Sequence, residues 1–181
     1  MFPFPIFGFN TRVNSSSGLW TGQTASWTFT GDDITNGTVD RHIRTASAIS
    51  TTGDFDVVFT PTNLANSQGF GVYDTAEDAT FSDVTGSPGA GMASMTNSWW
   101  VKITAATTYN AMLGASTAAV GLTIANSDVI KIARESGTTK IYKNGSVAHT
   151  YASTQTVTTK AVAYNVNGVT FPTFADVSWS G

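Results

Sequence analysis

Apolar and polar residues alternate along much of the chain with the two-residue period of β-strands. In residues 25–29 the apolar side chains fall at positions 25, 27 and 29, and in residues 54–59 they fall at positions 55, 57 and 59. Asp54 and Asp56 occupy the opposite face of the second segment. Because successive side chains of a strand point to opposite faces, each segment predicts a strand with one buried and one solvated face.

Further strand candidates recur about every 10 to 15 residues, separated by clusters of Gly, Asn, Asp, Ser and Pro. This rhythm is typical of a β-sandwich or barrel rather than of βαβ units. The additional candidates are residues 69–73, 99–103, 128–134, 140–142, 146–151, 160–164 and 174–179. We therefore predict an all-β chain with almost no helix.

Two turns give the strongest local signal. Asn144 and Gly145 lie between two alternating runs and suit the positive φ angles of a type I′ turn. Ser136 and Gly137 make the same kind of connection back to residues 128–134. Residues 128–151 are thus predicted to form a three-stranded antiparallel meander.

Two segments carry weaker patterns. Residues 104–125 are rich in Ala, Thr and Gly and predict one or two poorly marked strands with loops. Residues 82–98 contain several Gly and a Pro and are interpreted as a long loop. A linker is not favoured, since too few residues remain on either side for two ordinary domains.

Composition narrows the possible functions. A chain of 181 residues predicts one domain, and 30 Thr against four Leu and two Glu favours strands. Nine Lys plus Arg and a net charge of -3 give no basic surface for nucleic acid or an anionic membrane. With no Cys and two His, we expect no disulfide, no thiolate zinc site and no cofactor built on His ligands.

The first nine residues combine four Phe with two Pro. The prolines favour an extended backbone, while Phe2, Phe4, Phe7 and Phe9 project large apolar rings. We predict that residues 1–12 form an arm that docks on a partner, and that residues 13–181 form a single sandwich domain. In the alternative interpretation, Phe7 and Phe9 begin the first strand of the chain's own core.

The same terminus lacks the positive and uninterrupted apolar regions of a secretory signal, so we expect no leader peptide. No stretch approaches the length of apolar residues that a membrane-spanning helix requires.

The C-terminal half resembles the concanavalin A-like lectin/glucanase superfamily. The resemblance rests on residues 128–134, a Gly turn, residues 140–145 ending in Asn-Gly, a short strand, and the terminal run 174–179. It covers residues 54–181. It implies an antiparallel two-sheet β-sandwich (jelly roll), a fold shared by lectins, glucanases, lyases and non-enzymatic modules of bacteriophage structural proteins.

Catalytic motifs of that superfamily are not matched. Its glucanases carry two Glu on one strand about 5 Å apart, whereas Glu77 and Glu135 are 58 positions apart. Asp54 and Asp56 share a strand face, yet they are also what the solvated half of an amphipathic strand provides. His149 and Tyr151 resemble part of the lyase set by spacing alone. We therefore predict no enzymatic activity and no catalytic residue.

Ligand sites remain candidates. Calcium would find oxygen ligands at Asp32 and Asp33, at Asp74, Glu77 and Asp78, or at Asp83, but no calcium-loop motif is present, so no metal site is predicted. Sugars stack on aromatic rings with wet polar edges. The candidates for such stacking are Trp99, Trp100, Tyr73 and Tyr142, and one of the two adjacent Trp side chains is expected to point outward.

Three classes of function compete. The favoured hypothesis is a non-enzymatic virion structural protein, a capsid decoration (cement) protein on the particle surface of a bacteriophage, docked through its N-terminal arm. It predicts a homo-oligomer, with a trimer favoured, bound to the capsid shell. The alternative is a carbohydrate-binding, lectin-like module of a tail fibre or receptor-binding protein. A polysaccharide-cleaving enzyme is disfavoured by the carboxylate count.

Overall fold

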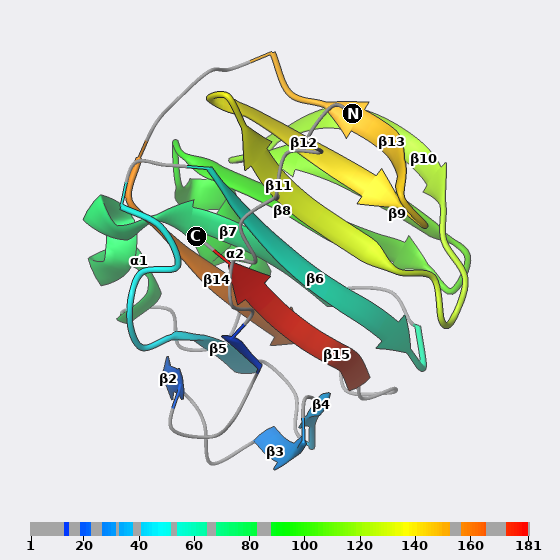
Figure 1. Ribbon diagram of the computed structural model, residues 1–181, viewed down its shortest axis with the longest axis horizontal. Coiled ribbons are helices and arrows are strands. Elements are labelled where there is room, and N and C mark those ends of the chain that lie inside the picture. The colour runs from blue at the N-terminus through cyan, green and yellow to red at the C-terminus, as the bar shows by residue number, and fades with distance from the viewer. Residues whose placement is uncertain are drawn as a thin grey trace, which may run out of the picture.

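A computed structural model gives the arrangement of the chain (Figure 1). It describes residues 13–14, 19–22, 27–31, 33–37, 41–51, 54–64, 68–82, 88–152, 157–165 and 173–180. Within these residues no helix is long and apolar enough to span a membrane.

The described residues form two antiparallel sheets packed face to face, which confirms the predicted jelly-roll sandwich. Sheet A has the order β13-β12-β11-β6-β15-β4-β3, and β1 pairs with β15. Its strands are β1 (Val13–Asn14), β3 (Trp27–Thr30), β4 (Asp33–Asn36), β6 (Phe55–Thr62), β11 (Ile130–Glu135), β12 (Thr138–Lys143), β13 (Ser146–Thr150) and β15 (Thr173–Ser180). Figure 1 looks onto this sheet.

Sheet B lies behind sheet A in that view and has the order β10-β9-β8-β7-β14-β5-β2. Its strands are β2 (Trp20–Gly22), β5 (Arg41–Thr45), β7 (Gln68–Asp74), β8 (Ser98–Ala105), β9 (Thr108–Leu113), β10 (Ser116–Thr123) and β14 (Thr159–Asn165). The predicted strands thus lie where expected, and residues 104–125 supply β9 and β10.

The predicted meander of residues 128–151 is confirmed as β11, β12 and β13. Asn144 and Gly145 have φ angles of 49° and 81°, and Ser136 and Gly137 have φ angles of 50° and 79°. These left-handed conformations match the two-residue turns that the sequence predicts.

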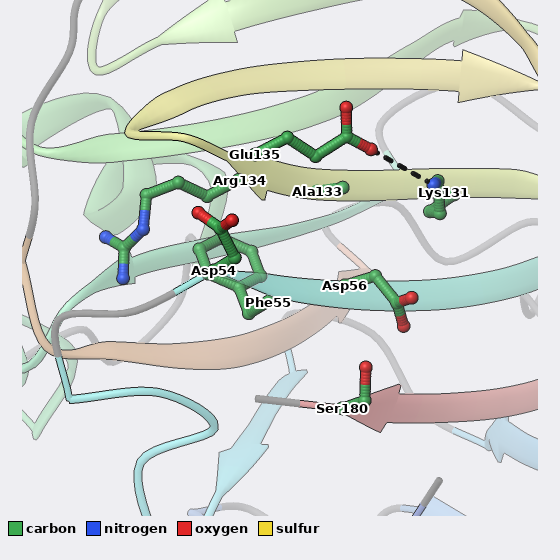
Figure 2. A pocket seen from close by; sticks show the side chains of 8 residues that line it. All are labelled: Asp54, Phe55, Asp56, Lys131, Ala133, Arg134, Glu135 and Ser180. Atoms are coloured by element: carbon green, nitrogen blue, oxygen red, sulfur yellow. Dashed lines mark hydrogen bonds and ion pairs between the residues drawn. The ribbon is translucent and has the colours of Figure 1, made fainter. Parts of the chain in front are cut away.

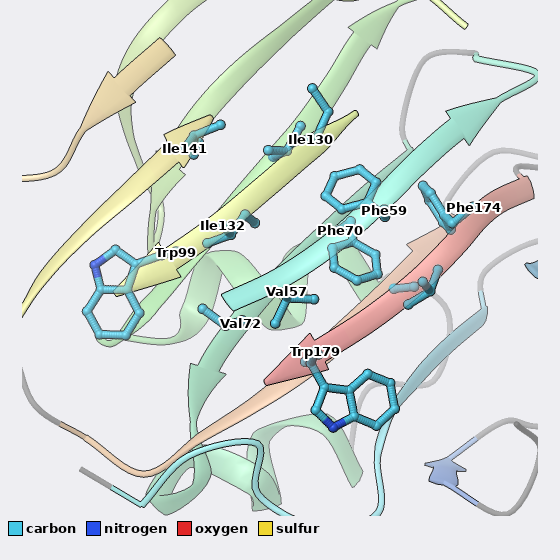
Figure 3. Packing of buried hydrophobic residues seen from close by; sticks show 14 of the residues in the cluster. Val57, Phe59, Phe70, Val72, Trp99, Ile130, Ile132, Ile141, Phe174 and Trp179 are labelled. Carbon is cyan, nitrogen blue, oxygen red and sulfur yellow. The ribbon is translucent and has the colours of Figure 1, made fainter. Parts of the chain in front are cut away.

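The core between the sheets is built by the inward half of each alternating strand (Figure 3). At its centre the ring of Phe59 on sheet A stacks on that of Phe70 on sheet B, with centroids 4.1 Å apart. Phe174 of β15 packs edge-on against Phe59 at 5.7 Å. The alternation at positions 55, 57 and 59 is confirmed, since all three side chains are buried.

One segment differs from its prediction. Residues 82–98 were expected to be a loop, but they contain α2 (Pro88–Ser94). The 3₁₀ helix η3 (Thr75–Glu77) and α1 (Asp78–Ser82) precede it. The run is rich in Gly and a poor helix former, so its packing on sheet B stabilises the helix.

The edge strands are short or irregular. β2 has three residues and β3 has four. At the opposite edges, register shifts interrupt the pairing of β10 with β9 and of β13 with β12. Bulges of this kind twist an edge away from regular pairing.

Candidate functional site

The predicted sugar-stacking residues of β8 and β7 are buried. Trp99 and Trp100 are each 1% exposed and Tyr73 is 0% exposed. Trp99 points into the core between the sheets, as expected for one of the pair (Figure 3). The expectation that its neighbour faces solvent is wrong, so neither indole offers a face to a sugar in this structure.

Trp100 belongs to a second, smaller apolar cluster on the outer face of sheet B. Met92 from α2 and Met95, which follows it, pack in this cluster. The ring of Trp100 lies 5.6 Å from that of Tyr164, and its Nε1 donates to the carbonyl of Gly114 at 3.0 Å. Helix α2, which the sequence did not predict, therefore contributes to a second apolar cluster that buries Trp100.

The carboxylate of Asp78 fastens α1 to sheet B. It accepts a 2.5 Å hydrogen bond from the Tyr73 hydroxyl and lies 2.7 Å from Lys160 Nζ and 3.0 Å from Arg44 Nε. Burial tends to raise the pKa of Asp78, but the bonds from Lys160 and Tyr73 and the charge of Arg44 outweigh it and lower the pKa. Tyr73 thus has a structural role.

Tyr142, the remaining sugar-stacking candidate, lies on the outer face of sheet A. The strand register places Tyr142 beside Lys131, Lys131 beside Val58, and Val58 beside Ser178. The Lys131 ammonium lies 4.0 Å from the centroid of the Tyr142 ring. Tyr142 is half-buried and is the one stacking candidate of the four that lies on this surface.

The next row of the same face forms a shallow pocket (Figure 2). Ala133 of β11 pairs with Asp56 of β6, and Asp56 pairs with Ser180 of β15. The pocket encloses about 160 Å³ and is lined by Asp54, Phe55, Asp56, Lys131, Ala133, Arg134, Glu135 and Ser180. The small side chain of Ala133 leaves a depression between the longer Lys131 and Glu135, two residues away on either side.

Glu135 organises one wall of this pocket. Its carboxylate accepts a 2.5 Å hydrogen bond from the Tyr142 hydroxyl and lies 3.0 Å from Lys140 Nζ and 3.4 Å from Lys131 Nζ. The Tyr142 bond is the largest influence on the pKa of Glu135 and, with the two lysines, lowers it despite partial burial. Glu135 is therefore an ionised acceptor near neutral pH.

Arg134 closes the inner side of the pocket. Its side chain is buried, and Nη1 donates to the carbonyl of Val157 at 2.9 Å. The guanidinium carbon lies 4.9 Å from the centroid of the Phe55 ring. Burial lowers the pKa of Arg134, and the charge of Asp54 opposes that change. The contacts anchor this end of β11 to the segment before β14.

The remaining catalytic candidates do not come together. Glu77 accepts from the backbone N–H groups of Thr96 and Asn97 beside sheet B, while Glu135 ends a strand of sheet A. The pair that a glucanase needs is not assembled from these two side chains. His149 packs edge-on against Tyr151 at 4.6 Å, but Tyr151 is 2% exposed and cannot reach a substrate.

The described acidic side chains considered for calcium are used by the protein. Asp74 accepts from the Ala76 N–H and from Asn97, and Glu77 and Asp78 have the partners given above. Asp32 and Asp83 lie outside the described residues. Among the residues that are described, no group of three or more His, Cys, Asp and Glu is arranged to hold a metal ion.

The predicted docking residues Phe2, Phe4, Phe7 and Phe9 lie outside the described residues, as does the whole of the predicted arm 1–12. The arm therefore stays a prediction. The pocket itself was missed by the sequence analysis, although Asp54 and Asp56 were noted as sharing a face. One signal in the sequence indicates the pocket: the small Ala133 lies between Lys131 and Glu135 on the outward positions of one strand.

Comparison with known proteins defines the fold. No family model and no curated protein sequence matches the chain. Among solved structures, the TRIM65 PSpry domain is similar with a TM-score of 0.57 at 11% identity, covering 83% of this chain and 82% of that one. The Emp47p carbohydrate recognition domain has a TM-score of 0.55 at 8% identity, covering 90% and 88%. The β-glucanase of Bacillus licheniformis has a TM-score of 0.51 at 15% identity, covering 93% and 94%.

These likenesses agree with the two-sheet topology described above. They include a carbohydrate recognition domain and a glucanase, at identities too low to carry an activity from either to this chain. The chain has the concanavalin A-like lectin/glucanase fold.

Proposed function

We propose that the chain is a non-enzymatic carbohydrate-binding module that holds a sugar unit on the outer face of sheet A. The observation that carries the proposal is the pocket above Ala133, walled by polar and charged side chains on three adjacent strands. Pockets for drug-sized ligands enclose about 300–1,000 Å³, so about 160 Å³ suits a single sugar ring.

The chemistry of the walls suits a ligand rich in hydroxyl groups. Ionised carboxylates accept several hydrogen bonds each, and the pocket has three, on Asp54, Asp56 and Glu135. The strands that carry them are hydrogen-bonded neighbours, so the acceptors sit on a rigid floor. Tyr142 adds a half-buried ring beside Glu135.

Glu135 does not suit the role of general acid in glycoside hydrolysis. Glycoside hydrolysis needs a carboxylic acid whose pKa is raised so that it can donate a proton. The pKa of Glu135 is instead lowered, chiefly by the Tyr142 hydroxyl.

The test is a panel of soluble oligosaccharides titrated by calorimetry into the chain and into the variant Ala133→Leu. Leucine fills the floor of the pocket without changing its charge, so we expect affinity to fall at least tenfold. Ala118→Leu makes the same change at an exposed position of β10 and should bind like the parent. Equal binding by the parent and Ala133→Leu would place the sugar elsewhere, and no binding to any member would end the proposal.

A second candidate is the virion structural protein, a cement protein docked on the bacteriophage particle surface as a homo-oligomer. The supporting observation is the sequence of the first nine residues, with Phe2, Phe4, Phe7 and Phe9 separated by prolines. Light scattering of the chain and of a variant lacking residues 1–9 tests it. The proposal expects a trimer that the deletion dissociates; a monomer in both cases would remove its support.

A further inference from the structure

The charges around the pocket indicate which class of sugar it takes, an inference that rests on the proposed carbohydrate binding. Three carboxylates line the pocket, on Asp54, Asp56 and Glu135, against two cations, on Lys131 and Arg134. Arg134 pairs with Phe55 in the strand register, so the next positions outward, Glu135 and Asp54, also lie across from each other. The acidic groups therefore come from both strands that frame the depression.

Both cationic side chains contact other groups of the protein. The Arg134 side chain is buried and donates to the Val157 carbonyl at 2.9 Å. The Lys131 ammonium lies 3.4 Å from Glu135 and over the Tyr142 ring. Lys140, just outside the lining, lies 3.0 Å from the same glutamate. The lysines thus concentrate on Glu135 at one wall.

The opposite wall is acidic. Asp56 is half-buried beside Ser180, and Asp54 is exposed directly before β6. A carboxylate offers about four acceptor sites. Oδ1 of Asp56 is buried, so a ligand would reach the other oxygen of Asp56 and the exposed carboxylate of Asp54. A ligand with its own carboxylate or sulfate would instead place a negative charge beside Asp56 and Asp54, which like-charge repulsion opposes.

We propose that the pocket selects an amino sugar, with the protonated amine of the bound unit directed at Asp56 and Asp54. An ammonium group supplies three N–H donors and a positive charge, which matches two carboxylates better than a hydroxyl does. Acetylation of the amine removes both the charge and most of the donors. The pocket therefore distinguishes free from acetylated amino sugars.

The experiment uses calorimetry at pH 6 and low salt to compare three tetrasaccharides, built of glucosamine, of N-acetylglucosamine or of galacturonate units. We expect glucosamine to bind at least tenfold more tightly than its acetylated form, and galacturonate to bind most weakly. Asp56→Asn should weaken glucosamine binding about tenfold and change binding of the acetylated form less than threefold. Asp54→Asn, at an exposed position, gives the same test if Asp56→Asn does not fold.

Asp33→Asn is the matched control, because it removes one negative charge from β4, outside the pocket lining. It should leave the ratio of the two affinities within twofold of the parent. Equal binding of glucosamine and its acetylated form, or tightest binding of galacturonate, would overturn the amino-sugar inference and leave carbohydrate binding in place. If none of the three binds but other sugars in the panel do, the inference also fails. Failure of the whole panel would end the proposed function itself.

Discussion

The hydroxyl of Tyr142 on β12 donates a 2.5 Å hydrogen bond to Oε2 of Glu135 on β11, across the hairpin that turns at Ser136 and Gly137. This bond holds the Glu135 carboxylate at the edge of the pocket, between Lys131 and Lys140. The Lys131 ammonium lies over one face of the Tyr142 ring, 4.0 Å from its centroid.

Tyr142→Phe removes that hydrogen bond and keeps the ring. We expect the pKa of Glu135 to rise and the free energy of unfolding at pH 7 to fall by about 1 kcal/mol. The pKa of Glu135 is lowered in the folded chain, so the stability it contributes is present above the unfolded value of 4.5 and is lost as pH falls through the folded value. The difference between parent and variant should therefore shrink in acid.

Carboxyl titration by NMR and urea unfolding at pH 7 and at pH 2.5 measure these effects. Tyr142→Leu removes the ring as well and should cost more stability than Tyr142→Phe. An unchanged Glu135 titration in Tyr142→Phe would contradict the role given to the bond.

Asp78→Asn tests the attachment of α1 to sheet B. The amide loses the charge that Lys160 and Arg44 face, so we expect a loss of about 2 kcal/mol at pH 7, as for hydrogen bonds to charged groups. The pKa of Asp78 is lowered in the folded chain, so the loss should disappear as pH falls below the unfolded value of 3.8. Urea unfolding across this pH range measures it, and a pH-independent difference would argue against an electrostatic origin.

Between pH 6.5 and about pH 4, His42 should dominate the pH dependence of the free energy of unfolding. Burial first, and the charge of Arg44 second, lower the pKa of His42 from 6.5 to about 4. The unfolded chain therefore takes up this proton first, so stability should fall as pH drops from 6.5 towards 4, by up to about 3 kcal/mol. In His42→Gln that slope should flatten, as measured by urea midpoints at intervals of pH.

His149→Gln is the control for this experiment. Its pKa is also lowered by burial, but the side chain is half-buried rather than buried. It should change the slope less than His42→Gln does. The reverse order would contradict the assignment to His42.

Gly71→Ala tests the close approach of β7 and β8. A Cβ at Gly71 would lie against the Cβ of Trp100 and 2.8 Å from the carbonyl oxygen of Trp99. Since these are backbone-fixed atoms, we expect overpacking to cost about 1–3 kcal/mol. Gly145→Asn, at a turn with open space and a φ of 81°, should cost far less. Thermal and urea unfolding of both variants compare them.

Local signals gave the parts of the fold that were predicted from sequence. The turns at Asn144 and Gly145 and at Ser136 and Gly137 fix their hairpins within a few residues, and alternation at 55, 57 and 59 fixes the inward face of β6. Burial of Trp100 was not predictable in this way. It depends on α2, whose Gly-rich run has little helix propensity of its own and forms on packing.

The pocket was hidden from sequence for a related reason. Ala133 lies beside Asp56 because β11 pairs with β6, and Asp56 lies beside Ser180 because β15 pairs with the other edge of β6. These residues are far apart in the chain, and no local pattern specifies such pairings. Taken one strand at a time, the outward residues predict only a solvated face.

The margins of the two sheets also constrain how copies of this chain can meet. Strands that end a sheet with regular geometry can recruit another chain's backbone and grow into fibrils. Here the described margins are either three or four residues long or interrupted by register shifts. Contact between copies would then depend on side-chain surfaces, not on backbone pairing at these margins.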